Sequence, residues 1–310
     1  MNILARRYLF FALSLLIIVP GLILLIVQAA NKDLPLSIDF TGGTMMEVEF
    51  ENELPAHSDV VTLYNRLGIQ DAIVTTTDEG TLVIRSSFLD ENLRREVMTA
   101  LQEEFGSLPE PRRVDSVGPS IGAQVTSRAA LAVGAAALVV IIYITFAFRG
   151  IPHAFRYGVC AIIAMIHDVA IVFSLVLIGS LLFDWQMDAL FLTALLTVIG
   201  FSVQDKIVVF DRIRENTNLL RRLDFETLVN HSIVQTLQRS INTQLMTVEF
   251  LLLALALMGG VTLREFAVIL LVGLLSGTYS SIFIAAPILV VWEKREWTTW
   301  FRRKANQAAA

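Results

Sequence analysis

The sequence predicts a polytopic α-helical membrane protein with one α+β domain outside the membrane. Of its 310 residues, 55% are hydrophobic, and the mean hydropathy is +0.65. Soluble domains hold about 45–50% apolar residues, so this excess is typical of membrane proteins. Charge-poor runs alternate with short basic segments, and one long acidic segment follows the first run.

Six runs have the roughly 20 apolar residues that are needed to cross a bilayer. They are Tyr8 to about Val27, Ala129–Phe148, Tyr157–Phe183, Ala189 to about Phe210, Arg239–Met258 and Phe266–Trp292. Six spans place both termini on one side. The segments on that side are rich in arginine and lysine, so the termini are predicted to be cytoplasmic. A cleaved signal peptide ending near Ala29 or Ala30 is the alternative for the first run, which is longer than the apolar core usual in such peptides.

Residues 31–124 differ from the rest in charge. They contain 7 basic and 17 acidic residues, whereas the remainder contains 17 basic and 12 acidic residues. We therefore expect an acidic extracytoplasmic domain that binds neither nucleic acid nor anionic lipid. The expected division is 1–30 (N-terminus and first span), 31–124 (this domain), 125–292 (five further spans) and 293–310 (a basic cytoplasmic tail).

The acidic segment shows the pattern of a small α+β domain. Alternating or β-branched runs at residues 44–50, 72–77, 81–87 and 112–117 predict four strands. Helical spacing occurs from His57 to Leu67 and from Glu91 to Phe105. The order β-α-β-β-α-β predicts a ferredoxin-like arrangement. Gly42 and Gly43 precede the first strand, where a turn explains them.

Several kinds of chemistry are disfavoured. One cysteine and four scattered histidines offer no metal-ligand spacing, and no Gly-Lys pair supplies a phosphate-binding loop. We expect no cofactor and no enzyme activity. Residues 118–122 match the G-x-S-x-G nucleophile pattern, but this domain holds one histidine and a proline precedes the serine. A hinge formed by Gly118, Pro119 and Gly122 is the preferred interpretation.

Asp205 is the most informative residue. It lies about 24 Å along the fourth span, where a charge costs roughly 2.5–3.5 kcal/mol. The long stem of Lys206 is expected to reach the cytoplasmic surface, but an aspartate is too short to do so. Arg239, at the inner end of the fifth span, is a candidate partner. The pair is either a static ion pair that fixes packing or a titrating carboxylate with a basic neighbour.

Two other acids lie deep in predicted spans. Asp168 is either a proton relay or a satisfied protonated carboxyl, and Glu249 faces either a partner subunit or a wet crevice. Gly273 and Gly277, with serines nearby, predict close helix packing.

Four motifs resemble those of SecF-type subunits in the SecD/SecF family of preprotein export: IDFTGGT (38–44), VGPSIGAQV (117–125), IGFSVQDKIVVFDRIREN (199–216) and SIVQTLQRSINT (232–243). The resemblance covers nearly the whole chain. It implies half of an RND-type transporter fold in the bacterial plasma membrane. The implied partners are a SecD subunit, the SecY/SecE/SecG channel and the translocating preprotein.

The resemblance also implies that the proton motive force is used through Asp205 and Arg239. Gln204 stands where the family usually has Asn, and Glu249 stands at a usually uncharged position. Two other functions remain open: an RND-like proton-coupled half-transporter of a small substrate, and a passive scaffold for a SecD-like partner.

Overall fold

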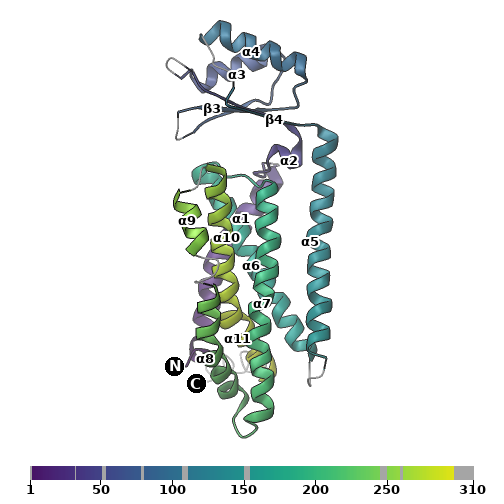
Figure 1. Cartoon of the computed structure of the whole chain (residues 1–310), viewed down its shortest axis with the longest axis vertical. Helices are drawn as coiled ribbons and strands as arrows, with labels where there is room; N and C mark the ends of the chain where they lie inside the picture. Colours follow the sequence, from purple (N-terminus) through teal and green to yellow (C-terminus); the bar gives the residue numbers. More distant parts are fainter. Residues whose placement is uncertain are drawn as a thin grey trace, which may run out of the picture. The chain divides into compact units, whose positions relative to one another are not determined.

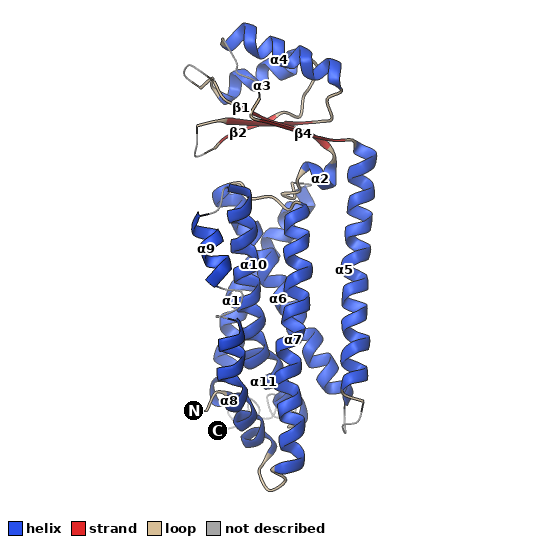
Figure 2. Ribbon diagram, in the orientation of Figure 1, coloured by secondary structure: helices blue, strands red, loops and turns tan. Residues whose placement is uncertain are grey.

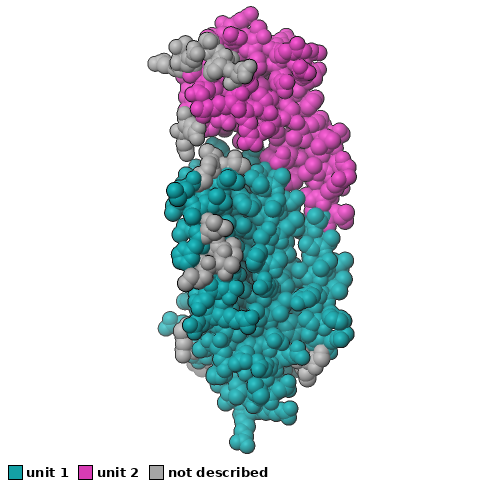
Figure 3. Space-filling model, viewed as in Figure 1, with its two compact units in different colours: residues 1–35, 132–310 teal, residues 36–131 magenta. Residues whose placement is uncertain are grey.

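The computed structural model describes residues 2–31, 33–50, 54–77, 80–106, 111–149, 154–244, 250–258 and 261–296. It contains two compact units, which Figure 3 shows in different colours. The sheet unit comprises residues 36–131, and the helical unit comprises residues 1–35 and 132–310.

Apart from a short additional helix, α2, the sheet unit has the order of elements that the sequence predicts. These are α2 (Ile38–Thr41), β1 (Gly43–Val48), α3 (His57–Arg66), β2 (Ile73–Thr76), β3 (Leu82–Ser86), α4 (Glu91–Phe105) and β4 (Arg113–Val117). The strands form an antiparallel sheet in the order β2-β3-β1-β4. In its register, Met46 of β1 lies opposite Ile84 of β3 and Val114 of β4.

Both longer helices of this unit cover one face of the sheet (Figure 2). Alternate strand residues point to that face and are buried, among them Met46, Leu82 and Ile84. Val97 and Leu101 of α4 pack on them because residues four apart share one face of a helix. The Asp90 carboxylate caps α4 by accepting a hydrogen bond of 2.8 Å from the Leu93 amide.

The double glycine before β1 is required by its backbone. Gly42 and Gly43 have φ angles of +74° and +135°, which side chains disfavour. A Cβ on Gly42 would lie 2.8 Å from the Cα of Pro119, and one on Gly122 would lie 2.5 Å from the amide nitrogen of Gly42. The start of β1 and the segment after β4 therefore approach each other backbone to backbone.

The helical unit consists mostly of long apolar helices, which Figure 1 labels along the chain. They are η1 (Leu4–Arg6), α1 (Arg7–Asn31), α5 (Pro119–Ala147, which begins in the sheet unit), α6 (Ala154–Phe183), α7 (Ala189–Leu219), α8 (Phe225–Gln244), α9 (Phe250–Met258), α10 (Val261–Ser280), the π-helix η3 (Ser281–Ala285) and α11 (Ala286–Glu293).

Five helices among the described residues are long and apolar enough to span a membrane. They are Leu4–Asn31, Pro119–Ala147, Ala154–Phe183, Ala189–Leu219 and Leu263–Glu293. The fifth span expected from the sequence includes residues 245–249, which lie outside the described residues. A protein with several membrane-spanning helices is thus confirmed, and the sixth span stays a prediction.

Small residues bring the central helices together. A Cβ on Gly273 of α10 would lie 2.3 Å from Val198 Cγ2, and one on Gly277 would lie 3.2 Å from the Cα of Ser202. The predicted packing role of these two glycines is confirmed, and their contact is with α7. Gly21 of α1 meets Ser174 of α6 in the same way.

One end of the helical unit carries an ion-pair cluster. Arg7 donates to Glu226 at 2.8 Å and to Glu296 at 2.5 Å, and Lys294 also donates to Glu226. The start of α1, the start of α8 and the residues after α11 therefore lie at the same end of this unit.

Candidate functional site

Among the described residues, two carboxylates are buried within the long helices: Asp168 of α6 and Asp205 of α7. Asp168 is completely buried, and Asp205 is 6% exposed. Both lie near the middle of helices that are long enough to span a membrane. Both carboxylates are buried within membrane-length helices, but one of them has a charged partner and the other does not.

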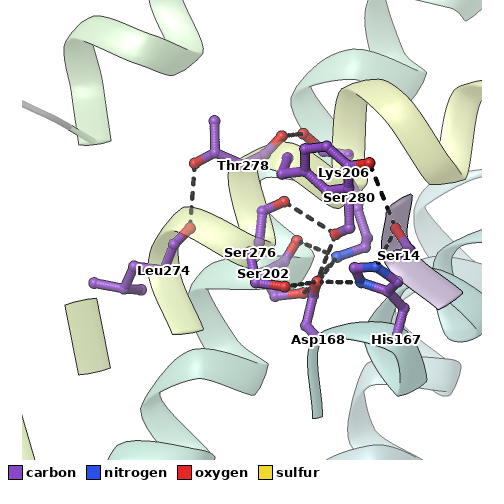
Figure 4. Close-up of polar contacts among 12 residues, drawn as sticks. Ser14, His167, Asp168, Ser202, Lys206, Leu274, Ser276, Thr278 and Ser280 are labelled. Atoms are coloured by element: carbon purple, nitrogen blue, oxygen red, sulfur yellow. Dashed lines mark hydrogen bonds and ion pairs between the residues drawn. The ribbon is translucent and has the colours of Figure 1, made fainter. Parts of the chain in front are cut away.

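Asp168 is at the centre of a polar cluster drawn from three helices (Figure 4). Its Oδ1 accepts hydrogen bonds from His167 Nδ1 at 3.0 Å and Ser276 Oγ at 2.7 Å. Its Oδ2 accepts from Ser202 Oγ at 2.6 Å, Ser280 Oγ at 2.7 Å and Lys206 Nζ at 2.8 Å. These five donors fit an ionised carboxylate, which only accepts hydrogen bonds.

The expectation that Lys206 reaches the cytoplasmic surface is wrong. Its side chain is fully buried, and its ammonium donates to Asp168 and also to the Ser202 hydroxyl and carbonyl. A buried carboxylate on the neighbouring helix lies within reach, so the lysine stem turns inward rather than extending along α7. The ion pair compensates two charges that would each be costly alone.

Asp205 has neutral partners. Its Oδ2 accepts a hydrogen bond of 2.9 Å from Gln244 Nε2 of α8 and another of 2.9 Å from Thr278 Oγ1 of α10. The ion pairs found among the described residues include none to Asp205. The carboxylate is therefore buried and hydrogen-bonded, without a cation in contact in the part of the chain that the structure describes.

Arg239 belongs to the helix that supplies Gln244, but its side chain is exposed and is not brought to Asp205. It precedes Gln244 by five residues, which corresponds to about 7.5 Å along α8. Glu249 lies outside the described residues, so its two interpretations remain as the sequence left them.

His167 joins the Asp168 cluster to a cavity. Its Nε2 lies 2.9 Å from Ser14 Oγ of α1, and its ring stacks on Tyr279. These residues line a largely apolar cavity of about 250 Å³ between α1, α6 and α10. Gln204 lines a second cavity, of about 350 Å³, together with residues of α5 and α7.

Gly118, Pro119 and Gly122 lie where β4 leads into α5. Pro119 is the first residue of α5, and Gly122 packs on the backbone of Gly42. The structure thus places these residues beside the double glycine and leaves the hinge untested.

Sequence reasoning missed several hydroxyl ligands of the two carboxylates. The sequence predicts a packing role for the serines near Gly273 and Gly277, which include Ser276 and Ser280, and it makes no prediction for Ser202 or Thr278. A signal existed, because Ser202 and Lys206 are four residues apart, as are Ser276 and Ser280, and each pair therefore shares one helix face. The sequence does not say that both faces meet Asp168.

Two models of known protein families match this chain. The model "Protein export membrane protein SecD/SecF, C-terminal" matches residues 96–295, and the model "SecD/SecF GG Motif" matches residues 32–53. The protein translocase subunit SecF of Anaerolinea thermophila is 66% identical over the full length of both chains. SecDF of Bacillus subtilis is 33% identical over 94% of this chain and 38% of its own.

The solved structures agree. A crystal structure of SecDF from Thermus thermophilus, described as a translocon-associated membrane protein, superposes with a TM-score of 0.80 at 32% identity. The match covers 95% of this chain and 39% of the SecDF chain. A second SecDF structure, in a form described as super-membrane-facing, gives a TM-score of 0.61 at 29% identity.

Proposed function

Because the chain belongs to the SecD/SecF family of protein export membrane proteins, we propose that it is an accessory subunit of the Sec translocon. In this role it uses the proton motive force to promote outward preprotein translocation across the plasma membrane. The observation that carries the proton coupling is Asp205, which is buried within a membrane-length helix and held by neutral donors.

Asp205 takes up a proton from one side of the membrane and releases it to the other. Each proton that crosses 100 mV supplies about 2.3 kcal/mol. Protonation turns an acceptor into a group that also donates, so the hydrogen bonds from Gln244 and Thr278 weaken or rearrange. These bonds tie α7 to α8 and α10, so the uptake of a proton changes how the three helices are held.

Arg239 acts in a second state of this cycle. It lies about 7.5 Å nearer to the start of α8 than Gln244 does. A shift of α8 along α7 by about 7.5 Å, together with a rotation of about 140° about its own axis, brings the guanidinium to the ionised carboxylate in place of the amide, because five helix residues separate the two side chains. Asp168 is a weaker candidate for the proton path, and Glu249 is the weakest.

The motion is passed to the sheet unit through the chain that joins the units. We place a hinge at Gly118, Pro119 and Gly122, which lie within the sheet unit where β4 continues into α5. The proposed topology has six spans, cytoplasmic termini and residues 31–124 outside the plasma membrane. The strand order β2-β3-β1-β4 supports a ferredoxin-like arrangement for that domain.

The proposed partners are a SecD subunit, the SecY/SecE/SecG channel, the preprotein and the lipid bilayer. The SecDF relatives support the SecD partner, since this chain corresponds to under two-fifths of their length, namely 38% and 39%. Copurification with a SecD-type chain and crosslinking of the outer domain to an arrested preprotein test these contacts.

The test of proton coupling is Asp205→Asn, assayed as preprotein export with the membrane potential on and off. We expect export to lose its response to the potential. Asp211→Asn is the matched control, because Asp211 lies on the same helix with its side chain 66% exposed. If the Asp205 variant keeps the full response, the proposal is wrong, and a passive scaffold would tolerate both this change and Arg239→Ala.

A further inference from the structure

Lys206 directly follows the proposed proton carrier in the sequence, yet all its described contacts are to other residues. Its ammonium is bound by Asp168 Oδ2 at 2.8 Å and by the carbonyl of Ser202 at 3.1 Å. A cation beside Asp205 would favour the ionised carboxylate and oppose proton uptake. The position of this one ammonium group therefore bears on whether Asp205 can exchange a proton.

The cluster that binds Lys206 compensates both charges of the ion pair. Besides the lysine, Asp168 accepts hydrogen bonds from three serine hydroxyls and from His167, so its negative charge is compensated on both oxygens. These donors come from α6, α7 and α10, whose close packing is fixed by Gly273 and Gly277. His167 and Ser14 stand between Asp168 and the neighbouring cavity.

We propose that Asp168 is a positioning residue that keeps Lys206 turned away from Asp205 and so leaves Asp205 free to bind a proton. The inference rests on the proposed role of Asp205 and assigns Asp168 a fixed charge in place of a relayed proton. Loss of the Asp168 charge releases a flexible lysine whose nearest buried carboxylate is then the adjacent Asp205. Successive helix residues diverge by about 100°, an angle that a four-carbon stem can span.

Among the described residues, few other titratable groups lie at the level of Asp205 on the helices packed against α7. From α6 these are Asp168 and His167, whose hydrogen bond of 3.0 Å joins them to each other. From α8 there is the exposed Arg239, and from α10 there is Tyr279, which stacks on His167. The π-helix η3 contributes no titratable side chain. Lys206 is thus the cation whose placement Asp168 controls directly.

The test is an infrared titration of the Asp205 carboxyl in the full chain with its SecD-type partner in lipid vesicles. The Asp205→Asn variant identifies the band that belongs to Asp205. We expect Asp168→Asn to move its titration midpoint toward acid by about one pH unit or more, since a cation within roughly 4–6 Å favours the carboxylate. Adding Lys206→Met to Asp168→Asn should restore the wild-type midpoint within about 0.3 pH units.

The double variant also guards against misfolding, because replacing both members of a buried ion pair is often close to neutral. Asp168→Glu, which keeps the charge, is the conservative control and should leave the midpoint in place. A double variant whose midpoint differs from the wild type overturns the proposal, as does a folded Asp168→Asn protein with no shift. If the Asp205 band never titrates in the wild type, the proposed function fails and this inference fails with it.

Discussion

The two compact units differ in the polar groups that they bury beside their apolar cores. In the helical unit the buried polar side chains include Asp168, Asp205 and Lys206. Large apolar residues of the same unit, such as Leu16 and Val139, are exposed. In the sheet unit the described buried polar residues are all hydroxyl side chains, and the core is aliphatic and aromatic. The helical unit therefore buries some of its charged groups, whereas the described part of the sheet unit keeps its charged groups at the surface. Lipid accepts an apolar exterior, so charges move inward to find partners, whereas water rewards an apolar interior.

The largest expected effect comes from removing a buried charge of the helical unit. Lys206→Met leaves Asp168 as a buried carboxylate without its counter-charge, which should cost about 3–5 kcal/mol of stability. Hydrogen exchange of the full chain in detergent micelles, followed on peptides from α6 and α7, measures the loss. Arg214→Met is the control, since the Arg214 side chain is 46% exposed, and it should change stability by less than about 0.5 kcal/mol. Equal protection of the α6 and α7 amides from exchange in the two variants would show that the buried charge pair does not stabilise the helical unit.

The next effect breaks the apolar interior of the sheet unit. Leu101→Ala should destabilise this unit by about 2–5 kcal/mol, because the side chain is fully buried against the sheet and leaves a cavity. The same exchange experiment, followed on α4 and β1 peptides, measures it. Ile73→Ala is the matched control, since Ile73 lies in the same unit and is 61% exposed. If Leu101→Ala reduced protection from exchange in the helical unit alone, the prediction that Leu101 stabilises the sheet unit would be contradicted.

A smaller effect tests the double glycine. Gly42→Ala should cost more than Gly68→Ala, although both positions have positive φ, at +74° and +84°. The left-handed backbone costs each alanine roughly 1–2 kcal/mol. At Gly42 the new methyl group would also meet the Cα of Pro119 at 2.8 Å, whereas at Gly68 it meets nothing within 4 Å. Thermal unfolding of the two variants, followed by circular dichroism, should separate them, and equal losses would show that the close approach is unimportant.

The smallest effect concerns the ion-pair cluster at the end of the helical unit. Hydrogen bonds from Lys294 and then Arg7 lower the pKa of Glu226 below its ordinary value. A lowered pKa stabilises the fold at pH values above the unfolded pKa, and this contribution is lost as the pH falls through the folded pKa. Glu226→Gln should therefore reduce stability by less than about 1 kcal/mol at neutral pH and have no effect in acid. Melting temperatures at pH 7 and pH 3 check the sign, and a larger loss at pH 3 would contradict it.

Much of the sheet unit could be predicted because its signals are local. The alternation in residues 44–50 and the helical spacing of Leu93, Val97 and Leu101 identify a strand and a helix face without knowledge of their neighbours. The structure begins β1 one residue earlier, at Gly43, and places α4 at Glu91–Phe105, as predicted. The buried carboxylates of the helical unit were also visible, since a charge in an apolar run stands out in any sequence.

The sequence alone therefore determined the strands and longer helices of the sheet unit, the membrane class and the family resemblance, and it made Asp205 a candidate site. Only the tertiary structure decided which groups the acids meet: Lys206 and three serines for Asp168, and Gln244 and Thr278 for Asp205. The physical reason is distance along the chain. Ser276 lies 108 residues from Asp168, so their contact depends on how α6 and α10 pack. A lysine stem likewise has room to point along its helix or across it, and the neighbouring charge decides.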